Sequence, residues 1–435
     1  MPWQQVSVRV KGREGSFLGS LRPAERRMET VQARQASSTD ELHRVGTVDP
    51  SIADRFSLVI GGPFYRALAR TGLVEPEPNL RIRIPVFVLL TWVPLLALSL
   101  AKGTAIGSRT NITLLRDFSV YGRFLLGLPL LIIAEVVIDP WIQRVVSIFK
   151  TSGIVRKEDL PAYYAALAKT KRLRDSGLAE FIIGVLAAFP VFLVFESEWR
   201  SDGITAWHGS TSAGLSPAGW WFTFISSPII RFIIFRWLWR YALWTALLYK
   251  IAKLKLQMIP THPDHLGSLG FVPFAQKSFG ILFMAVSCFA AGQYANSITY
   301  FGMPLAATKG PMVAYVVLSV LLVLGPLFTL SPKLAETRRN GLARYSQLAR
   351  DLTGAFDSKW AKGNPAPESM LGNADPSSII DYVSTCHVIR DMQVIPINRQ
   401  LVIQVAVMAA APLLLVWIFW TPVEQIIAGL FKMVL

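Results

Sequence analysis

A short polar segment between two long apolar runs concentrates side chains that could bind a metal ion or transfer a proton. His262, Asp264 and His265 offer nitrogen and oxygen ligands for a divalent cation, or a histidine base oriented by a carboxylate. Their spacing matches no established ligand pattern. A turn explains the same residues, because Gly267 and Gly270 permit positive φ and the polar side chains can cap the next helix. The sequence leaves both interpretations open.

Three arginines lie within a single apolar run, where a charged side chain needs a partner, water or an interfacial position. Arg236 and Arg240 are four residues apart on one helical face, among tryptophans typical of a membrane interface. Arg231 lies deeper, three residues after Pro228, which lacks a backbone N–H and permits a kink. A kink beside a buried cation predicts an anion site. Alternatively, Arg231 bonds the carbonyls that the proline frees.

Three acidic residues are predicted at the same depth as two of these arginines. Glu135 and Asp139 are four residues apart on one helical face, and Glu180 begins the next apolar run. We expect these carboxylates to neutralise Arg236 and Arg240 across neighbouring helices. The alternative is that the charges line a permeation or substrate pathway.

A polar stripe follows one face of a later apolar run. Gln293, Asn296 and Tyr300 lie at positions i, i+3 and i+7, and such a stripe faces protein or water. It serves either helix packing through side-chain hydrogen bonds or the lining of a pore. The two cysteines, Cys288 and Cys386, predict no disulfide framework.

Seven apolar runs must position all these side chains. A hydrocarbon core of about 30 Å needs about 20 apolar residues at 1.5 Å rise each, and each run approaches or exceeds that length. The runs cover residues 84–101, 118–138, 178–195, 220–248, 279–300, 312–330 and 401–420. A hydrophobic content of 52% and 13 tryptophans agree with this class. We predict an all-α polytopic membrane protein with about seven transmembrane helices.

The basic residues predict how the chain is oriented. The number of Lys and Arg residues alternates between high and low in successive loops. The positive-inside rule therefore places the N-terminus and loops 139–177, 249–278 and 331–400 in the cytoplasm. The C-terminus is then outside. Much of the net charge of +16 reflects this orientation and contact with anionic lipid headgroups. No aromatic interleaving or fold signature accompanies the charge, so we predict no nucleic-acid partner.

The apolar runs and the segments between them define five regions. We predict a disordered basic tail, an interfacial amphipathic helix, a six-helix membrane region, a cytoplasmic helical appendage and a seventh transmembrane helix. They cover, in that order, residues 1–50, 56–73, 84–330, 331–400 and 401–420. The loop 139–177 contains a predicted helix from Leu160 to Leu173. In the appendage, Pro332 opens one helix and Asp375 is the expected N-cap of a second.

The His-Pro-Asp tripeptide at residues 262–264 is similar to the signature of J-domain co-chaperones, but here membrane runs flank it on both sides. Read together with residues 356–360 and 388–396, the segment resembles a family of bacterial multi-pass inner-membrane proteins that have a His-Pro-Asp, Gly and Leu-Gly-Phe pattern. The similarity covers about residues 56–422. It implies a bacterial origin and an inner-membrane location, and it brings no established activity.

The leading functional hypothesis is transport or channel-like passage of a small solute or anion. Arg231 would attract the anion, Arg236 and Arg240 would line its inner approach, and Gln293 and Asn296 would complete an outer path. This hypothesis requires a cytoplasm-facing vestibule among the second to fourth helices.

Two alternatives remain. A membrane-embedded enzyme would use His262, Asp264 and His265 at the cytoplasmic surface, although no nucleophile or complete metal-ligand set is recognisable, so that no metal or cofactor is predicted. A structural or assembly subunit would use the tail and the appendage as docking surfaces. The lipid bilayer is the certain partner in each case, and a homo-oligomer stays open.

Overall fold

The computed structural model describes residues 56–72, 79–107, 110–189, 205–210, 214–362, 369–370 and 372–420. Within these ranges the regular structure is helical, apart from two short strands, β1 (Gly209–Ser210) and β2 (Gly214–Leu215), which pair antiparallel. The predicted all-α class is confirmed. The tail predicted over residues 1–50 lies outside the described residues.

Six helical stretches in the described part of the chain are long and apolar enough to cross a membrane. They are Leu80–Ala101, Phe118–Thr151, Pro217–Ala252, Phe271–Phe301, Leu305–Ala361 and Arg399–Phe419. Each coincides with one of the predicted runs. The chain is a multi-pass membrane protein.

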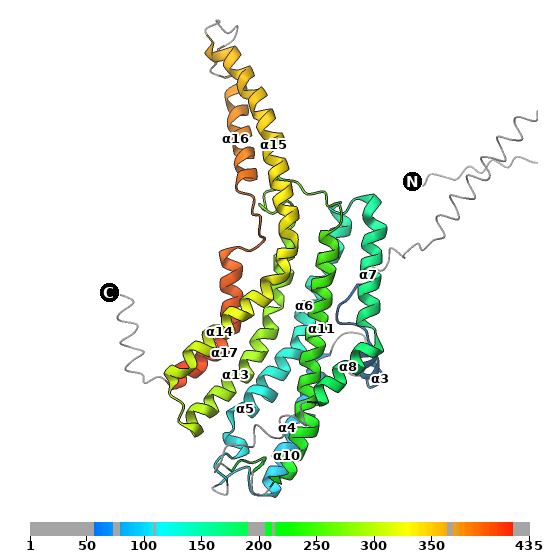
Figure 1. The fold of residues 1–435 in the computed structure, drawn as a ribbon, viewed down its shortest axis with the longest axis vertical. Coiled ribbons are helices and arrows are strands. Elements are labelled where there is room, and N and C mark those ends of the chain that lie inside the picture. Colours follow the sequence, from blue (N-terminus) through cyan, green and yellow to red (C-terminus); the bar gives the residue numbers. More distant parts are fainter. Residues whose placement is uncertain are drawn as a thin grey trace, which may run out of the picture. The chain divides into compact units, whose positions relative to one another are not determined.

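The run predicted over residues 178–195 differs from the other six. Its described part is α8 (Gly177–Ala188), a helix of 12 residues that reaches about 18 Å at 1.5 Å per residue. Residues 190–195 of that run lie outside the described residues. The number of seven transmembrane helices therefore stays a prediction. Helix α8 follows α7 (Leu160–Arg174), which agrees with the helix predicted there, and both pack against α11 (Ser227–Ala252) (Figure 1).

Two of the spanning stretches contain a π-helical turn in their N-terminal half. The second stretch consists of α5 (Phe118–Val120), the π-helical η2 (Tyr121–Gly127) and α6 (Leu128–Thr151). The next consists of α10 (Pro217–Trp221), the π-helical η4 (Phe222–Ser226) and α11. Such turns are rare within α-helices and occur frequently at functional sites. Because α6 extends to Thr151, the loop predicted to start at residue 139 starts about a dozen residues later.

Helix α4 (Leu80–Ala101) is fastened to the π-helical region through carbonyls near Pro94. A proline lacks the N–H that would bond the carbonyl four residues earlier. The Leu90 carbonyl instead accepts a hydrogen bond from Trp221 Nε1 at 3.3 Å, and the Thr91 carbonyl accepts one from Ser226 Oγ at 2.8 Å. The proline therefore frees the Leu90 carbonyl for contact with Trp221, and the bond to Thr91 lies beside it.

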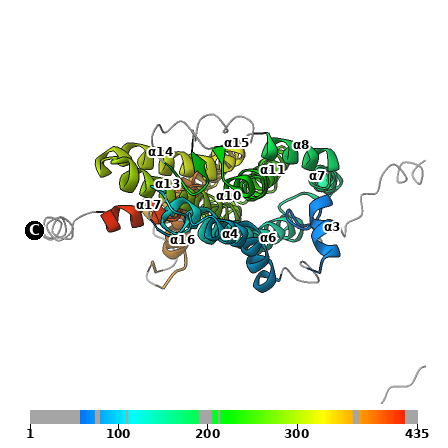
Figure 2. The ribbon, with the colours of Figure 1, turned by 90° about the horizontal axis from the view of Figure 1, so that it is seen from below.

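The C-terminal half of the membrane region is built around α13 (Gly280–Phe301), which packs against η2, α14 (Leu305–Leu324) and α17 (Arg399–Trp420) (Figure 2). The contact with α5 is close because it uses glycine. A Cβ at Gly292 would lie 2.6 Å from the Phe118 carbonyl oxygen. The remaining short elements are η1 (Leu114–Arg116), η3 (Lys157–Asp159), α12 (Phe271–Ser278) and η5 (Gly325–Leu330).

The predicted appendage is a helical hairpin. Helix α15 (Ser331–Phe356) continues α14 through η5, extends into the π-helical η6 (Asp357–Ala361) and packs against α16 (Asp375–Arg390) (Figure 1). The prediction that Asp375 is an N-cap is wrong, because Ala374 holds that position. Asp375 Oδ2 instead accepts hydrogen bonds from Lys359 Nζ at 2.7 Å and Trp360 Nε1 at 3.1 Å, which close the far end of the hairpin.

The helix predicted over residues 56–73 is shorter than expected. Only α3 (Pro63–Arg70) is helical, whereas Phe56, Leu58 and Val59 lie in a buried, non-helical segment. The Asp139 carboxylate accepts hydrogen bonds from the backbone N–H groups of this segment, and those bonds replace the ones that a helix would make. The residues before α3, from Phe56 to Val59, therefore belong to the protein core.

Candidate functional site

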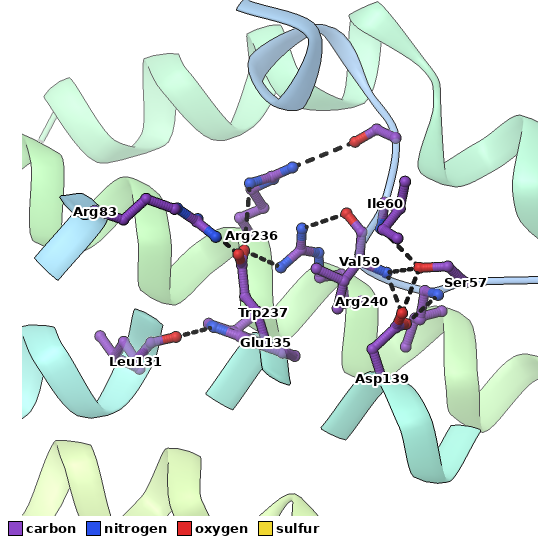
Figure 3. A network of polar contacts seen from close by, with 12 residues as sticks. Ser57, Val59, Ile60, Arg83, Leu131, Glu135, Asp139, Arg236, Trp237 and Arg240 are labelled. Atoms are coloured by element: carbon purple, nitrogen blue, oxygen red, sulfur yellow. Dashed lines mark hydrogen bonds and ion pairs between the residues drawn. The ribbon is translucent and has the colours of Figure 1, made fainter. Parts of the chain in front are cut away.

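Glu135 of α6 lies at the centre of a buried group of charges (Figure 3). Its carboxylate is 2.7 Å from Arg83 Nη2, 2.9 Å from Arg240 Nη1 and 3.8 Å from Arg236 Nη1. All four side chains are buried. The predicted pairing of Glu135 with Arg240 and Arg236 is confirmed. Arg83 was not predicted, because it lies at the start of α4, before the apolar run.

Glu180 completes what we call the ionic cluster, formed by Arg83, Glu135, Glu180, Arg236 and Arg240. Its Oε1 lies 3.5 Å from Arg236 Nε, as predicted, and its Oε2 accepts a hydrogen bond from the Phe64 N–H at 2.7 Å. The cluster therefore joins α4, α6, α8 and α11 to the first turn of α3, and Arg240 Nη2 also donates to the Val59 carbonyl in the segment before α3. It holds three guanidinium groups and two carboxylates.

The pairing predicted between Asp139 and the arginines is wrong. Asp139 accepts hydrogen bonds from Ser57 Oγ at 2.7 Å, from the N–H groups of Leu58 and Val59 at 2.8 and 3.2 Å, and from Gln143 Nε2 at 2.7 Å. Backbone N–H groups are the same for every residue type except proline, so the residue types alone do not indicate this contact. The carboxylate fixes the buried N-terminal segment (Figure 3).

The ionic cluster is closed around its charges. The space left among its side chains is about 10 Å³, close to the roughly 10 to 15 Å³ that one water requires. The Arg236 guanidinium lies 4.8 Å from the Phe64 ring centroid, and that of Arg240 lies 4.9 Å from the Trp237 ring. Trp237 Nε1 in turn donates to the Leu131 carbonyl at 2.9 Å. In this conformation the cluster has no room for a permeating ion.

A second arginine region, which we call the arginine cavity, lies farther along α11 toward its N-terminus. The cavity has a volume of about 260 Å³ and is bordered by two arginines, one serine and five apolar side chains. They are Arg123, Phe124, Phe222, Ser227, Ile230, Arg231, Ile234 and Phe289. These residues come from η2, η4, α11 and α13, so that the two π-helical turns flank the cavity. Arg231, the residue at which the sequence predicted an anion site, borders this cavity, and the anion site itself stays a prediction.

Arg123 is the residue of the arginine cavity that the sequence analysis did not select. It is half-buried, and its guanidinium lies 5.8 Å from the Phe222 ring centroid. A usable signal was present, because Arg123 is the one Lys or Arg within the apolar run 118–138. Charged residues at such depth face the interior of a helix bundle or a water-filled space.

The predicted polar stripe on α13 divides into two environments. Asn296 is buried, with Nδ2 donating to Asp117 Oδ1 at 2.7 Å and Oδ1 accepting from the Phe118 N–H at 2.9 Å. Asp117 also accepts from Trp207 Nε1 at 2.8 Å. Gln293 is exposed on the surface of the helix. Asn296 therefore fixes the start of the stretch that carries Arg123.

The His-Pro-Asp loop, residues 260–270, is organised by Asp264. Its Oδ1 accepts from the N–H groups of Leu266 at 2.9 Å and Ser268 at 3.2 Å, and its Oδ2 accepts from the Gly270 N–H at 2.9 Å. His262 Nδ1 lies 2.8 Å from Oδ1. Burial alone would raise the pKa of Asp264, but the hydrogen bonds from the backbone and His262 hold the pKa below its ordinary value. The contacts match those of the predicted turn.

The other residues predicted in this loop have backbone roles. His265 and Gly267 adopt positive φ angles of 53° and 60°, and the His265 carbonyl accepts a hydrogen bond from the Gln393 N–H at 2.8 Å. The loop is thereby attached to the segment between α16 and α17. Among the residues the structure describes, no group of three His, Cys, Asp or Glu side chains could hold a metal ion.

Comparison of the chain with protein-family models, with curated proteins and with solved structures finds no match.

Proposed function

We propose that this protein binds a small anion within its membrane region and carries it across the bilayer. The observation that carries the proposal is the arginine cavity, because Arg123 and Arg231 border one space of about 260 Å³ between membrane-spanning helices. A charge interacts much more strongly with a counter-ion in a low-dielectric setting than in water. Two guanidinium groups beside apolar walls therefore favour an anionic ligand.

The size and lining of the cavity indicate the class of anion. The volume is many times the roughly 10 to 15 Å³ that one water needs, so a partly hydrated halide, nitrate or bicarbonate ion has room. Guanidinium groups donate hydrogen bonds in a planar fork that suits oxyanions, and Ser227 adds a hydroxyl donor. A planar or tetrahedral oxyanion is the preferred ligand.

In this proposal the ionic cluster closes the inner side of the route. Ile233 borders the cluster, whereas Ile230 and Ile234 border the cavity, so an apolar layer on α11 separates the two regions. Passage requires the cluster to open, as in transporters that expose one site alternately to the two sides of a membrane. The π-helical turns at η2 and η4 supply backbone that can adjust in such a motion.

Flux and binding measurements on the full chain test the proposal. Arg231→Gln and Arg123→Gln should each weaken nitrate binding by about tenfold, the loss expected for one charge-assisted contact, and should reduce nitrate flux into liposomes accordingly. Arg350→Gln, at an exposed position of α15, is the matched control and should leave both unchanged. The proposal fails if halide, nitrate, bicarbonate and phosphate fluxes all equal those of protein-free liposomes.

A further inference from the structure

A second large pocket lies between the start of α12 and the first turn of α17, away from the arginine cavity. Its volume is about 270 Å³. The polar groups that border it are Asp264, Lys277, Gln393, Asn398, Gln400 and Gln404. One wall is the His-Pro-Asp loop, and the opposite wall is the segment that enters α17. We call it the interface pocket.

The interface pocket lies where two membrane spans begin. The stretch Phe271–Phe301 starts on one side of it and the stretch Arg399–Phe419 starts on the other. Beside it, the rings of Trp141 and Phe274 stack with centroids 6.4 Å apart, although 39% and 55% of these residues are exposed. Exposed aromatic side chains at the end of spans are typical of the level of the lipid headgroups. The pocket therefore opens where phospholipid headgroups lie.

The charges of the pocket have both signs. Lys277 supplies an ammonium group, and Asp264 supplies a carboxylate on the loop wall. The two Asp264 carboxylate oxygens accept different numbers of hydrogen bonds. Oδ1 accepts from two backbone N–H groups and lies beside His262, whereas Oδ2 accepts from the Gly270 N–H alone in the described contacts. Since a carboxylate oxygen has about two acceptor sites, Oδ2 keeps one for a ligand.

We infer that the interface pocket binds the zwitterionic phosphoethanolamine headgroup of a membrane phospholipid. The ligand ammonium donates to Asp264 Oδ2, and the phosphate lies against Lys277. The side-chain amides of Gln400 and Gln404, in the first turns of α17, donate to the remaining phosphate oxygens. The acyl chains then leave the pocket past Phe274 toward the bilayer.

Other common headgroups fit these groups less well. A phosphocholine headgroup has a cation without N–H donors, so it cannot hydrogen-bond to Asp264 Oδ2. A phosphoglycerol headgroup has no cation, and its net negative charge would face the Asp264 carboxylate without compensation. The combination of Lys277 with Asp264 therefore selects for a headgroup that carries both charges.

A bound headgroup would connect two parts of the chain that are already in contact. The Gln393 N–H donates to the His265 carbonyl across the same junction at 2.8 Å. A lipid between the loop and α17 adds contacts to both walls, and any ligand that binds the folded state alone stabilises it. We therefore expect phosphatidylethanolamine to stabilise the protein as well as to bind.

Native mass spectrometry of the delipidated full chain, with added phospholipids of identical acyl chains, tests the inference. Phosphatidylethanolamine should bind at one site at least about tenfold more tightly than phosphatidylcholine or phosphatidylglycerol, as expected for one charge-assisted contact. Lys277→Gln should weaken the binding of all three lipids, because each has the phosphate that lies against Lys277, and should lower the affinity for phosphatidylethanolamine by about tenfold. Lys253→Gln, a lysine at the C-terminal end of α11 whose Nζ lies over Tyr249, is the matched control outside the pocket and should leave that affinity unchanged.

A second variant keeps the result interpretable if Lys277→Gln folds poorly. Gln404→Leu removes one amide of the pocket without changing the charge, and it should lower the affinity for phosphatidylethanolamine while thermal unfolding of the lipid-free protein stays unchanged. Soluble glycerophosphoethanolamine should compete only weakly with the lipid. Equal binding of the three lipids, a preference for phosphatidylglycerol, or tighter binding of the soluble compound than of the lipid would overturn the inference.

Discussion

Helix α11 carries two arginine regions that differ in what surrounds them. In the ionic cluster, Arg236 and Arg240 meet carboxylates from α6 and α8, and about 10 Å³ of space remains. In the arginine cavity, Arg231 shares a space of about 260 Å³ with Arg123 and apolar side chains. The same residue type, on one helix, is enclosed in the first region and borders open space in the second.

The difference teaches that the partners supplied by other helices decide the role of a membrane arginine. Taking charges out of water is costly, and close carboxylates offset that cost in the ionic cluster. A closed cluster of this kind fixes which helices contact one another. Arginines beside a cavity can instead exchange solvent or ligand. Removing charge should therefore damage the fold at the cluster and ligand binding at the cavity.

The largest effect is expected for Glu135→Gln. The substitution leaves the guanidinium groups of Arg83, Arg236 and Arg240 with Glu180 as the remaining carboxylate of the cluster. Breaking a buried ion pair by removing one partner costs about 3 to 5 kcal/mol. We expect the free energy of unfolding, measured by denaturant titration in detergent micelles, to fall by that amount.

A double substitution separates this effect from a general loss of packing. Glu135→Gln combined with Arg240→Gln removes one charge of each sign, and part of the lost stability should return because fewer cations remain uncompensated. If Glu135→Gln alone unfolds like the wild type, the cluster is not structural and the contrast with the cavity disappears.

A smaller loss is expected for Asp139→Asn, which tests the attachment of the N-terminal segment. The amide nitrogen of asparagine is a donor, so it would face donors at either position: the N–H groups of Leu58 and Val59 in place of Oδ1, or Ser57 Oγ and Gln143 Nε2 in place of Oδ2. We expect about 1.5 to 3 kcal/mol of destabilisation, the range for hydrogen bonds to a charged group. Hydrogen exchange at residues 57–60 should accelerate, whereas Asp351→Asn on the exposed face of α15 should change neither quantity.

The cavity should respond to ligand in a way that the cluster does not. At a concentration ten times the dissociation constant, a bound anion should stabilise the folded protein by about 1.4 kcal/mol. Arg231→Gln, with about tenfold weaker binding, should reduce the stabilisation at the same nitrate concentration to about 0.4 kcal/mol and lessen the dependence of the melting temperature on nitrate accordingly. Arg240→Gln should lower the melting temperature and leave the nitrate dependence in place. If Arg240→Gln weakened the nitrate dependence and Arg231→Gln did not, the ionic cluster and not the arginine cavity would be the anion site.

Much of the fold could be predicted because apolar length and charge are local properties of the sequence. Six predicted runs coincide with spanning stretches, and the hairpin after residue 331 has the expected helices. The segment at Phe56 and Leu58 was assigned to a helix because its apolar residues have helical spacing. Its true conformation depends on Asp139, a residue about 80 positions away, and such a contact has no local signature.

Of the candidate site, only charged residues could be predicted from the sequence. The pairing of Glu135 with Arg240 follows from depth and spacing, since both must lie at one level of the bilayer. Arg83 was not predicted as a member of the cluster because it precedes an apolar run. The cavity at Arg123 was not predicted because a void depends on how four helical segments pack together. Sequence spacing places side chains on faces of helices, but it does not give the distance between those helices.

The smallest effect is expected at Asp264, outside the membrane-spanning stretches. The Asp264 carboxylate accepts hydrogen bonds from backbone N–H groups, whereas the Glu135 carboxylate pairs with guanidinium groups. Because the pKa of Asp264 in the folded protein lies below its ordinary value of 3.8, its stabilising contribution is complete above about pH 4 and disappears as the pH falls through the folded-state pKa. The protection of the Gly270 amide against hydrogen exchange, taken relative to the intrinsic rate at each pH, should therefore fall below that pH. Asp264→Asn should lack this protection at every pH, and the exposed control Asp381→Asn should match the wild type. A loop that keeps its protection at acid pH would show that backbone geometry, not this charge, holds it.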